Sequence, residues 1–393
     1  MGMQIPARFR RTPDAVRQFG ERLERFAPYL LRSDVLADEA TAAMAELGPP
    51  GACMKLLDRA LREGIEAVPE APAPLRALLE QVHRVPVWVD WGAIERGGSA
   101  FLRSGMLGGM VLGARALVLS YTAPGGNKPL VFSGRLQEQA GRRLAETGRF
   151  VQAVTRPGGL RRGADGFTMT VKVRMMHAGV RRVIRQSGRF RVDLWGEPIN
   201  QHDMLGTLIL FSVVVIDGLE QLGYRVPPQE AEDLVHLWRY VGHLIGVEAD
   251  LLPGSYAEAR RYGEMIRATQ GTPDDDSRAL VHALLESGVA GAKNDKVRRQ
   301  AERQRAFAAG LIRYFLGDSL ADELAVPRSP YRHIAPVLRA MVSATERTRK
   351  LPFVRDLALR AGDRYWDMAG NQVLRGISPD FMPPERVRSV MAA

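Results

Sequence analysis

The stretch Met204-Leu-Gly-Thr-Leu-Ile-Leu-Phe-Ser-Val-Val-Val-Ile216 is apolar around almost the whole circumference of a helix. Asn200 lies before it with an acid three residues later, which resembles a capping box, and Gly223 follows. The sequence therefore predicts one helix from this cap to Leu222. The apolar run is bounded by Asp203 and Asp217 and is too short to cross a bilayer. A helix that is hydrophobic on every side belongs at the centre of a large bundle.

The segments around this helix are helical as well, and strands and helices do not alternate, which argues against a doubly wound sheet. The chain has 393 residues and is 46% hydrophobic, enough for a large core. We expect an all-α fold with one large helical domain at 75–375, preceded by a helical extension at 1–74 and followed by a tail at 376–393. Helices are predicted near 14–32, 36–47, 53–64, 74–83, 104–122, 134–150, 228–245, 256–269, 277–288, 296–316, 331–347 and 353–371.

Composition limits the partners. The net charge of +11 is spread along the sequence without a long basic run, so no nucleic-acid partner is expected, and peripheral contact with an anionic membrane stays open. Arg115 interrupts the apolar helix near 104–122, which argues against a transmembrane segment. The single cysteine, Cys53, excludes an intramolecular disulfide framework and any cysteine-based metal site. Arg10-Arg11 is followed by polar residues, not by an export signal, so we expect a cytoplasmic protein.

One helix carries the candidate chemistry: Lys172-Val-Arg-Met-Met-His-Ala-Gly-Val-Arg181. His177 lies on an apolar face, with Arg174 and Arg181 about one turn away on either side. A neutral imidazole on an apolar wall can ligate a metal axially, and two guanidinium groups can bind paired carboxylates. Haem requires both. A hydrogen-bonded core histidine between two solvated arginines explains the same local pattern, so both interpretations stay open at this point.

Rival sites are weaker. His236 and His243 share a side of their helix, but a di-iron site needs a Glu-x-x-His motif on each of two helices. The chain has one such motif, Glu80-Gln-Val-His83, and no His-x-x-x-His pair. It also contains no Gly-x-Ser-x-Gly elbow, no phosphate-binding loop and no dinucleotide-binding glycine motif after a strand.

The motif Arg174-Met-Met-His177-Ala-Gly-Val-Arg181 resembles the haem helix of the MpaB-like oxygenases, which include the latex-clearing proteins. Further elements agree in the same order along the chain. They are the Arg-x-x-x-Thr element from Arg143 to Thr147, Gly196-Glu-Pro-Ile-Asn-Gln-His-Asp-Met-Leu-Gly-Thr-Leu208, Trp238-Arg-Tyr-Val-Gly-His-Leu-Ile-Gly-Val247 and Leu251-Leu-Pro253. The similarity is clearest from about 134 to 255 and extends more weakly over most of 75–375.

This resemblance implies a globin-like helical core that encloses haem b, with His177 as the proximal iron ligand. It places Arg174 and Arg181 beside the cofactor and Arg143, Glu146 and Thr147 on the distal, catalytic side. It implies an oxygenase that uses dioxygen to oxidise or cleave a carbon–carbon double bond of a hydrophobic or polyprenoid substrate.

Two features depart from the family pattern. Glu146 stands where rubber-cleaving members have a lysine, so distal ligation or gating must differ; the glutamate is either a base near oxygen or an exposed residue at the helix margin. The missing export signal disfavours extracellular rubber as the substrate. A haem carrier or sensor without turnover, and a haem-free basic protein that binds anionic surfaces, are the alternatives.

Overall fold

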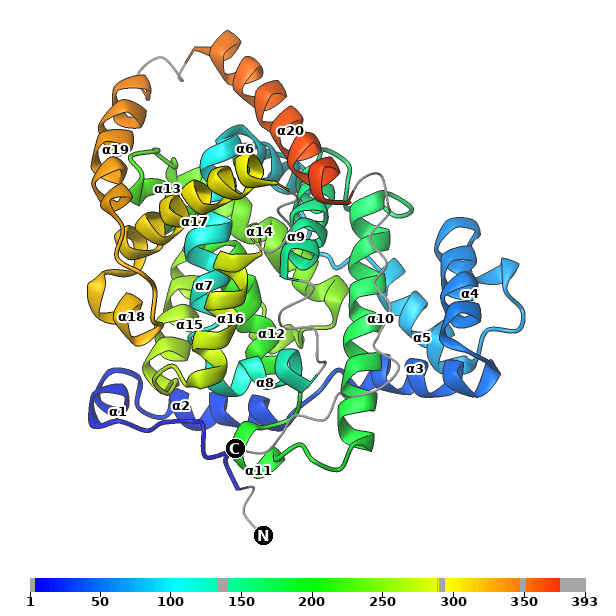
Figure 1. Cartoon of the computed structure of the whole chain (residues 1–393). Helices are drawn as coiled ribbons and strands as arrows, with labels where there is room; N and C mark the ends of the chain where they lie inside the picture. Colours follow the sequence, from blue (N-terminus) through cyan, green and yellow to red (C-terminus); the bar gives the residue numbers. More distant parts are fainter. Residues whose placement is uncertain (1–3, 133–139, 288, 290–293, 347–350, 375–393) are drawn as a thin grey trace.

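A computed structural model describes residues 4–132, 140–287, 289, 294–346 and 351–374. Across these residues the chain forms helices and connecting loops and contains no β-strand. The expected all-α class is therefore confirmed, and the helices pack into a single body (Figure 1). The predicted tail at 376–393 lies outside the described residues.

The helices have the following bounds. They are α1 (Pro13–Phe19), α2 (Arg22–Phe26), η1 (Ala27–Leu31), α3 (Val35–Leu47), α4 (Pro50–Glu63), η2 (Ile65–Ala67), α5 (Ala73–His83), α6 (Trp91–Val111), η3 (Leu112–Ala116), α7 (Leu117–Ser120), α8 (Pro124–Phe132), α9 (Ala140–Thr155), α10 (Asp165–Gln186), α11 (Val192–Trp195), α12 (Gln201–Phe211), α13 (Val213–Gln221), α14 (Pro228–Ile245), η4 (Ala249–Leu251), α15 (Tyr256–Thr269), α16 (Asp275–Glu286), α17 (Asp295–Leu316), α18 (Asp318–Glu323), η5 (Pro330–His333), α19 (Ile334–Thr345) and α20 (Pro352–Leu374).

The apolar stretch that begins at Met204 lies in the core, but it forms two helices where the sequence predicts one. Asn200 caps α12 as expected, because its side chain accepts a hydrogen bond from the Asp203 amide at 2.9 Å. The chain leaves helical geometry at Ser212, with φ −109° and ψ −84°. The Ser212 hydroxyl donates to the Leu208 carbonyl at 2.7 Å, a bond that competes with regular helix geometry. The second helix, α13, then ends one residue before Leu222.

The predicted helix at 104–122 also has a more complex course. It is part of α6, which bends at Gly105 with φ +49° and continues into the π-helical turn η3 and then α7. Trp91–Ser120 and Gln201–Gln221 are long and apolar enough to cross a membrane by length and composition alone. Both stretches pack against other helices here, since α6 contacts α9, α14 and α20, and α12 contacts α14 and α15.

The N-terminal region forms shorter helices than the sequence predicts, and it packs directly against the rest of the bundle. The predicted helix at 14–32 is split into α1, α2 and η1, with Gly20 at φ +55° between the first two. The next helix, α3, packs against α5 and against α10. The boundary between 74 and 75 stays a prediction, but α3 contributes directly to the region of the candidate site.

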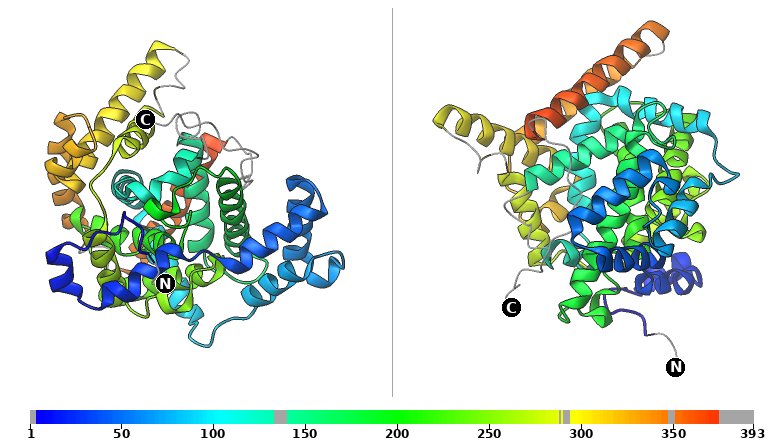
Figure 2. Two further views of the ribbon diagram at one scale, coloured as in Figure 1. Left: turned by 90° about the horizontal axis from the view of Figure 1, so that it is seen from below. Right: turned by 90° about the vertical axis from the view of Figure 1, so that its right-hand side faces the viewer.

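Two neighbouring helices carry the candidate site. The helix of His177, α10, packs against α9, the helix of Arg143, Glu146 and Thr147. The N-terminal helices α3, α4 and α5 lie on the outer side of α10, while α20 crosses α6 and α9 at the opposite end of the bundle (Figures 1 and 2).

Candidate functional site

His177 has the properties of a metal-ligating imidazole. Its Nδ1 atom is buried and has no hydrogen-bond partner, although the residue as a whole is partly exposed. Burial, together with the nearby positive charge of Arg181, lowers the pKa of His177 to about 3. The ring is therefore neutral at pH 7 and has a lone pair available. A buried nitrogen without a hydrogen-bond partner lowers stability. The site therefore suits a group that Nδ1, or the other ring nitrogen, Nε2, can bind.

Arg174 is buried in an ion pair with a carboxylate of the N-terminal helix α3. Its side chain is 1% exposed. Nε and Nη2 donate to the two carboxylate oxygens of Asp34 at 2.6 and 2.9 Å, and Nη1 donates to the Gln81 side chain at 2.8 Å. Gly246, at φ +91°, lies directly against this pair. A Cβ there would come within 2.7 Å of Arg174 Nε and would also clash with the carboxylate.

Arg181 repeats this arrangement two turns later on α10. Its side chain is fully buried, and Nε donates to Asp38 of α3 at 2.6 Å. The other oxygen of Asp38 accepts from Arg185 at 2.8 Å. The two arginines of the motif thus attach α10 to Asp34, the N-cap residue of α3, and to Asp38 in the first turn of that helix.

These contacts bear on the roles predicted for Arg174 and Arg181. The solvated-edge interpretation is wrong, since both Arg174 and Arg181 are buried. Their cofactor-binding role stays a prediction, but each guanidinium group already binds a protein carboxylate. The arginines hold the helix of His177 in place, and a propionate would have to share them with Asp34 and Asp38.

The three residues predicted for the distal side lie on α9. Arg143 is half-buried, and its charge acts on the nearby Tyr121, where burial raises the pKa and Arg143 lowers it. Glu146 accepts a hydrogen bond from Arg142 Nε at 2.8 Å in an i, i+4 pair. Thr147 is partly buried. No described contact joins these residues to His177. The pairing of Glu146 with Arg142 favours the interpretation of a residue at the helix margin over that of a free base.

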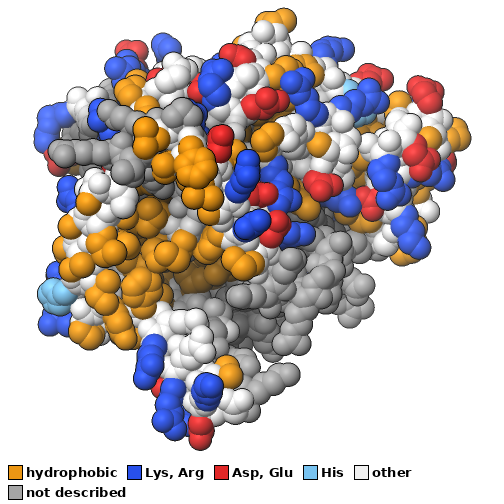
Figure 3. Space-filling model, turned by 90° about the horizontal axis from the view of Figure 1, so that it is seen from above, with side chains coloured by type: hydrophobic (Ala, Val, Ile, Leu, Met, Phe, Trp, Pro, Cys, Tyr) orange, Lys and Arg blue, Asp and Glu red, His pale blue; other side chains and the backbone are white. Residues whose placement is uncertain are grey.

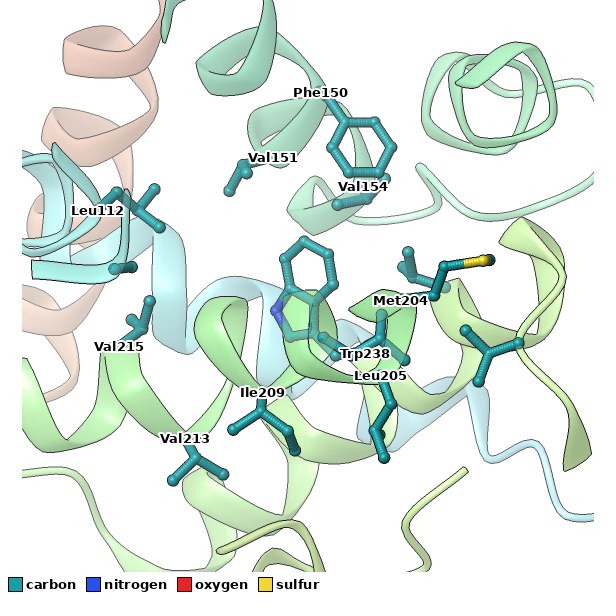
Figure 4. Packing of buried hydrophobic residues seen from close by; sticks show 14 of the residues in the cluster. Leu112, Phe150, Val151, Val154, Met204, Leu205, Ile209, Val213, Val215 and Trp238 are labelled. Carbon is teal, nitrogen blue, oxygen red and sulfur yellow. The ribbon is translucent and has the colours of Figure 1, made fainter. Parts of the chain in front are cut away.

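An apolar core adjoins α9. Trp238 of α14 is buried and stacks on Phe211, with ring centroids 4.7 Å apart and an interplanar angle of 12°. Phe150 and Val154 of α9 lie above its indole ring, and Leu205 of α12 lies below it (Figure 4). The indole Nε1 has no hydrogen-bond partner. Helix α9 thus borders a closely packed apolar core.

The C-terminal helix α20 holds α9 from outside. Arg156 donates to Asp363 at 2.9 Å and to Asp367 at 2.8 Å, and Gln152 donates to the same two carboxylates at 3.2 and 3.0 Å. In contrast to the pairs on α10, these ionic side chains are about 40% exposed. Trp366 stacks on Phe101 of α6 beneath them, with centroids 5.4 Å apart.

Sequence reasoning missed Asp34, Asp38 and the two carboxylates of α20. The first two belong to a segment that the sequence marks only as an extension, although their spacing of one helical turn resembles a matched acidic face. Nothing in the sequence connects either pair to its arginines, because the partners are more than 130 residues apart.

The fold and the site together define an all-α protein with a neutral, partly buried histidine on an internally anchored helix. Residues 102–347 match the family model described as "ER-bound oxygenase mpaB/B'/Rubber oxygenase, catalytic domain", and the chain belongs to this family. It is 26% identical over 326 residues to the rubber oxygenase of Streptomyces sp. (strain K30), covering 82% of this chain and 78% of that protein. The solved structure of latex clearing protein LCP in the closed state has the same fold. The two structures match with a TM-score of 0.72 and 23% sequence identity, and the match covers 91% of this chain and 95% of the latex clearing protein chain.

Proposed function

We propose that this protein is a haem b-dependent oxygenase that oxidises or cleaves a carbon–carbon double bond of a hydrophobic, isoprenoid-like substrate with dioxygen. The observation that carries the proposal is the neutral, unpartnered imidazole of His177 in a member of the MpaB and rubber oxygenase family. Membership supports an oxygenase. The properties of His177 support haem as its cofactor, and we propose around it the globin-like core that the family resemblance implies.

In this proposal His177 is the iron ligand, and Arg174 and Arg181 fix the helix that presents it. Bound haem would supply the activation of dioxygen. The protein contributes a ligand that stays unprotonated, a helix that cannot shift easily, and an apolar interior that excludes water. Arg143 and Thr147 of α9 are proposed to face the reacting groups. Glu146, bound by Arg142, orders the distal helix in this proposal.

The substrate class follows from the relative and from the core. The Streptomyces relative is a rubber oxygenase, and polyisoprene consists of repeated apolar units with double bonds. In this chain Trp238, Phe150 and Phe211 supply an apolar surface beside α9. We propose a smaller or membrane-dissolved isoprenoid in place of solid rubber.

Oxygen consumption by the haem-loaded protein tests this function. We expect oxygen uptake with soluble polyprenoids or carotenoids and carbonyl products detectable by mass spectrometry. His177→Ala should remove both the Soret band and the uptake, whereas His282→Ala, at an exposed histidine of α16, should retain them. A Soret band without uptake on any alkene would instead support the haem carrier or sensor. No Soret band after loading with haem would contradict both.

A further inference from the structure

The outward side of α19 is apolar. Ile334, Val337 and Met341 are between 43% and 63% exposed, and their i, i+3, i+7 spacing places them on one face. On the inward side Ala335 and Val342 are buried against the bundle. This helix therefore presents a stripe of large hydrophobic side chains that no other described element covers.

The outward side of α20 combines apolar and cationic residues. Phe353, Leu357 and Met368 are strongly exposed, with Phe353 at 77%. At 100° per residue, Arg360 and Arg364 lie on the same arc of the helix between them, and both are exposed. Neither arginine has an ion-pair partner among the residues that the structure describes.

The opposite side of α20 is the one that packs. Gly362 crosses α6 so closely that a Cβ would collide with the Leu102 carbonyl, and Trp366 is buried between the helices. The first turns of α20 extend beyond the body of the bundle (Figures 1 and 2). Seen from this end of the molecule, hydrophobic side chains gather over a broad, hollowed area with Lys and Arg side chains near it (Figure 3).

We propose that the exposed face of α20, together with the apolar stripe of α19, docks on an anionic lipid bilayer. Arginines that lie among apolar side chains can bury their methylene stems beside them at a membrane interface and extend the guanidinium groups to the lipid phosphates. The net charge of +11 adds attraction to an anionic surface. An acidic groove on a partner protein fits this arc less well than a bilayer does. Apolar and cationic side chains alternate along the arc, and Asp356 lies at its margin.

This docking goes beyond the proposed oxygenase function and does not depend on haem. It has a functional consequence if both hold. Because α20 packs on α9, only the thickness of α20 would separate the bilayer from the helix that carries Arg143 and Thr147. An isoprenoid-like substrate would then be taken from the apolar phase in which it dissolves.

Vesicle flotation with the full chain tests the docking directly. We expect binding to phosphatidylcholine vesicles that contain phosphatidylglycerol and much weaker binding to pure phosphatidylcholine vesicles. Arg360→Glu with Arg364→Glu should weaken binding by more than about 25-fold, since the loss of each arginine near an anionic surface alone costs about fivefold and each glutamate adds repulsion. Phe353→Ser with Leu357→Ser should also weaken it.

The matched control is Arg22→Glu with Arg25→Glu, which makes the same change of charge on exposed residues of α2 at the other end of the molecule (Figure 1). This control should bind within about twofold of the native chain, since Arg22 and Arg25 lie far from the docked face. Equal losses in both charge variants, or no flotation with anionic vesicles, would overturn the proposal. So would a native dimer that the Phe353 and Leu357 variant converts to a monomer, because the face would then join two copies. The Soret band of each variant reports haem binding separately from docking.

Discussion

Helix α10, which carries His177, and helix α9, which carries Arg143 and Thr147, are both held by arginine–carboxylate pairs, but in different surroundings. The pairs Arg174–Asp34 and Arg181–Asp38 join α10 to the N-terminal helix α3 and are buried. The pairs of Arg156 with Asp363 and Asp367 join α9 to the C-terminal helix α20 and are about 40% exposed. A buried charge that loses its partner is very costly, whereas a half-exposed pair contributes little. The molecule therefore fixes α10, the helix of His177, firmly and holds α9 more loosely.

The largest expected effect is the loss of a buried partner. Asp34→Asn keeps a side chain that can cap α3 but leaves the charge of Arg174 buried and uncompensated. We expect the free energy of unfolding to fall by about 3–5 kcal/mol, measured by urea denaturation of the apoprotein. The matched change Asp363→Asn on α20 should cost about 1 kcal/mol or less. Equal losses at the two positions would remove the distinction between the helices.

The next effect tests how tightly the Arg174–Asp34 pair is enclosed. Gly246→Ala introduces a Cβ at φ +91° that collides with this pair, so we expect a loss of about 2 kcal/mol or more. Gly188→Ala has a similarly positive φ of +63° but open space around it, and should lose only the part due to backbone strain. Thermal denaturation of both variants gives the difference. If Gly188→Ala loses as much, the enclosure does not matter.

A smaller effect concerns the polar contacts between α9 and α20. Combining Asp363→Asn with Asp367→Asn should lower the free energy of unfolding by only about 1–2 kcal/mol, because these carboxylates are well solvated. Amide hydrogen exchange should reveal the change locally, with faster exchange in α20 and α9 and unchanged exchange in α10. Faster exchange throughout α10 would contradict a loosely held distal helix and a separately anchored proximal one.

The smallest expected effect is a Soret band that does not change with pH. A histidine with an ordinary pKa near 6.5 would be about 97% protonated at pH 5, and this proton would compete with a metal and lower its apparent affinity about 30-fold. The pKa of His177 is about 3, so the Soret band of the haem-loaded protein should stay constant from pH 7 to pH 5. A midpoint near pH 6.5 would contradict a buried, neutral ligand.

The same pKa predicts the sign of the pH dependence of stability in the apoprotein. Below about pH 6.5 the unfolded chain takes up a proton at His177 that the folded chain does not, so this residue lowers stability as the pH falls towards 3. His177→Leu should remove that part of the acid dependence. His202, whose pKa is also lowered by burial, contributes equally in both proteins and cancels in the comparison.

Sequence patterns predicted local features well and distant pairings poorly. The all-α class and the Asn200 cap follow from periodicity and from one local hydrogen bond. The break at Ser212 was missed, because the segment is apolar on both sides of it and the hydroxyl bond that accompanies the break is a detail of geometry.

The candidate site shows the same limit. His177 could be selected from its own helix, because one imidazole on an apolar face is visible in the sequence. The structural role of Arg174 could not be predicted in this way. Its partner Asp34 is 140 residues away, and the burial of Arg174 depends on how α3 folds back on α10. Glu146 was visible as a departure from the family pattern, but its pairing with Arg142 appears only in the structure.

The central claim is that His177 ligates haem iron from a firmly anchored helix. Replacing it by glycine removes the ligand and leaves the space of the imidazole ring. We expect the His177→Gly protein to lose the Soret band of the native complex and to regain it when millimolar imidazole is added. A band that survives in His177→Gly without imidazole would show that iron is bound elsewhere.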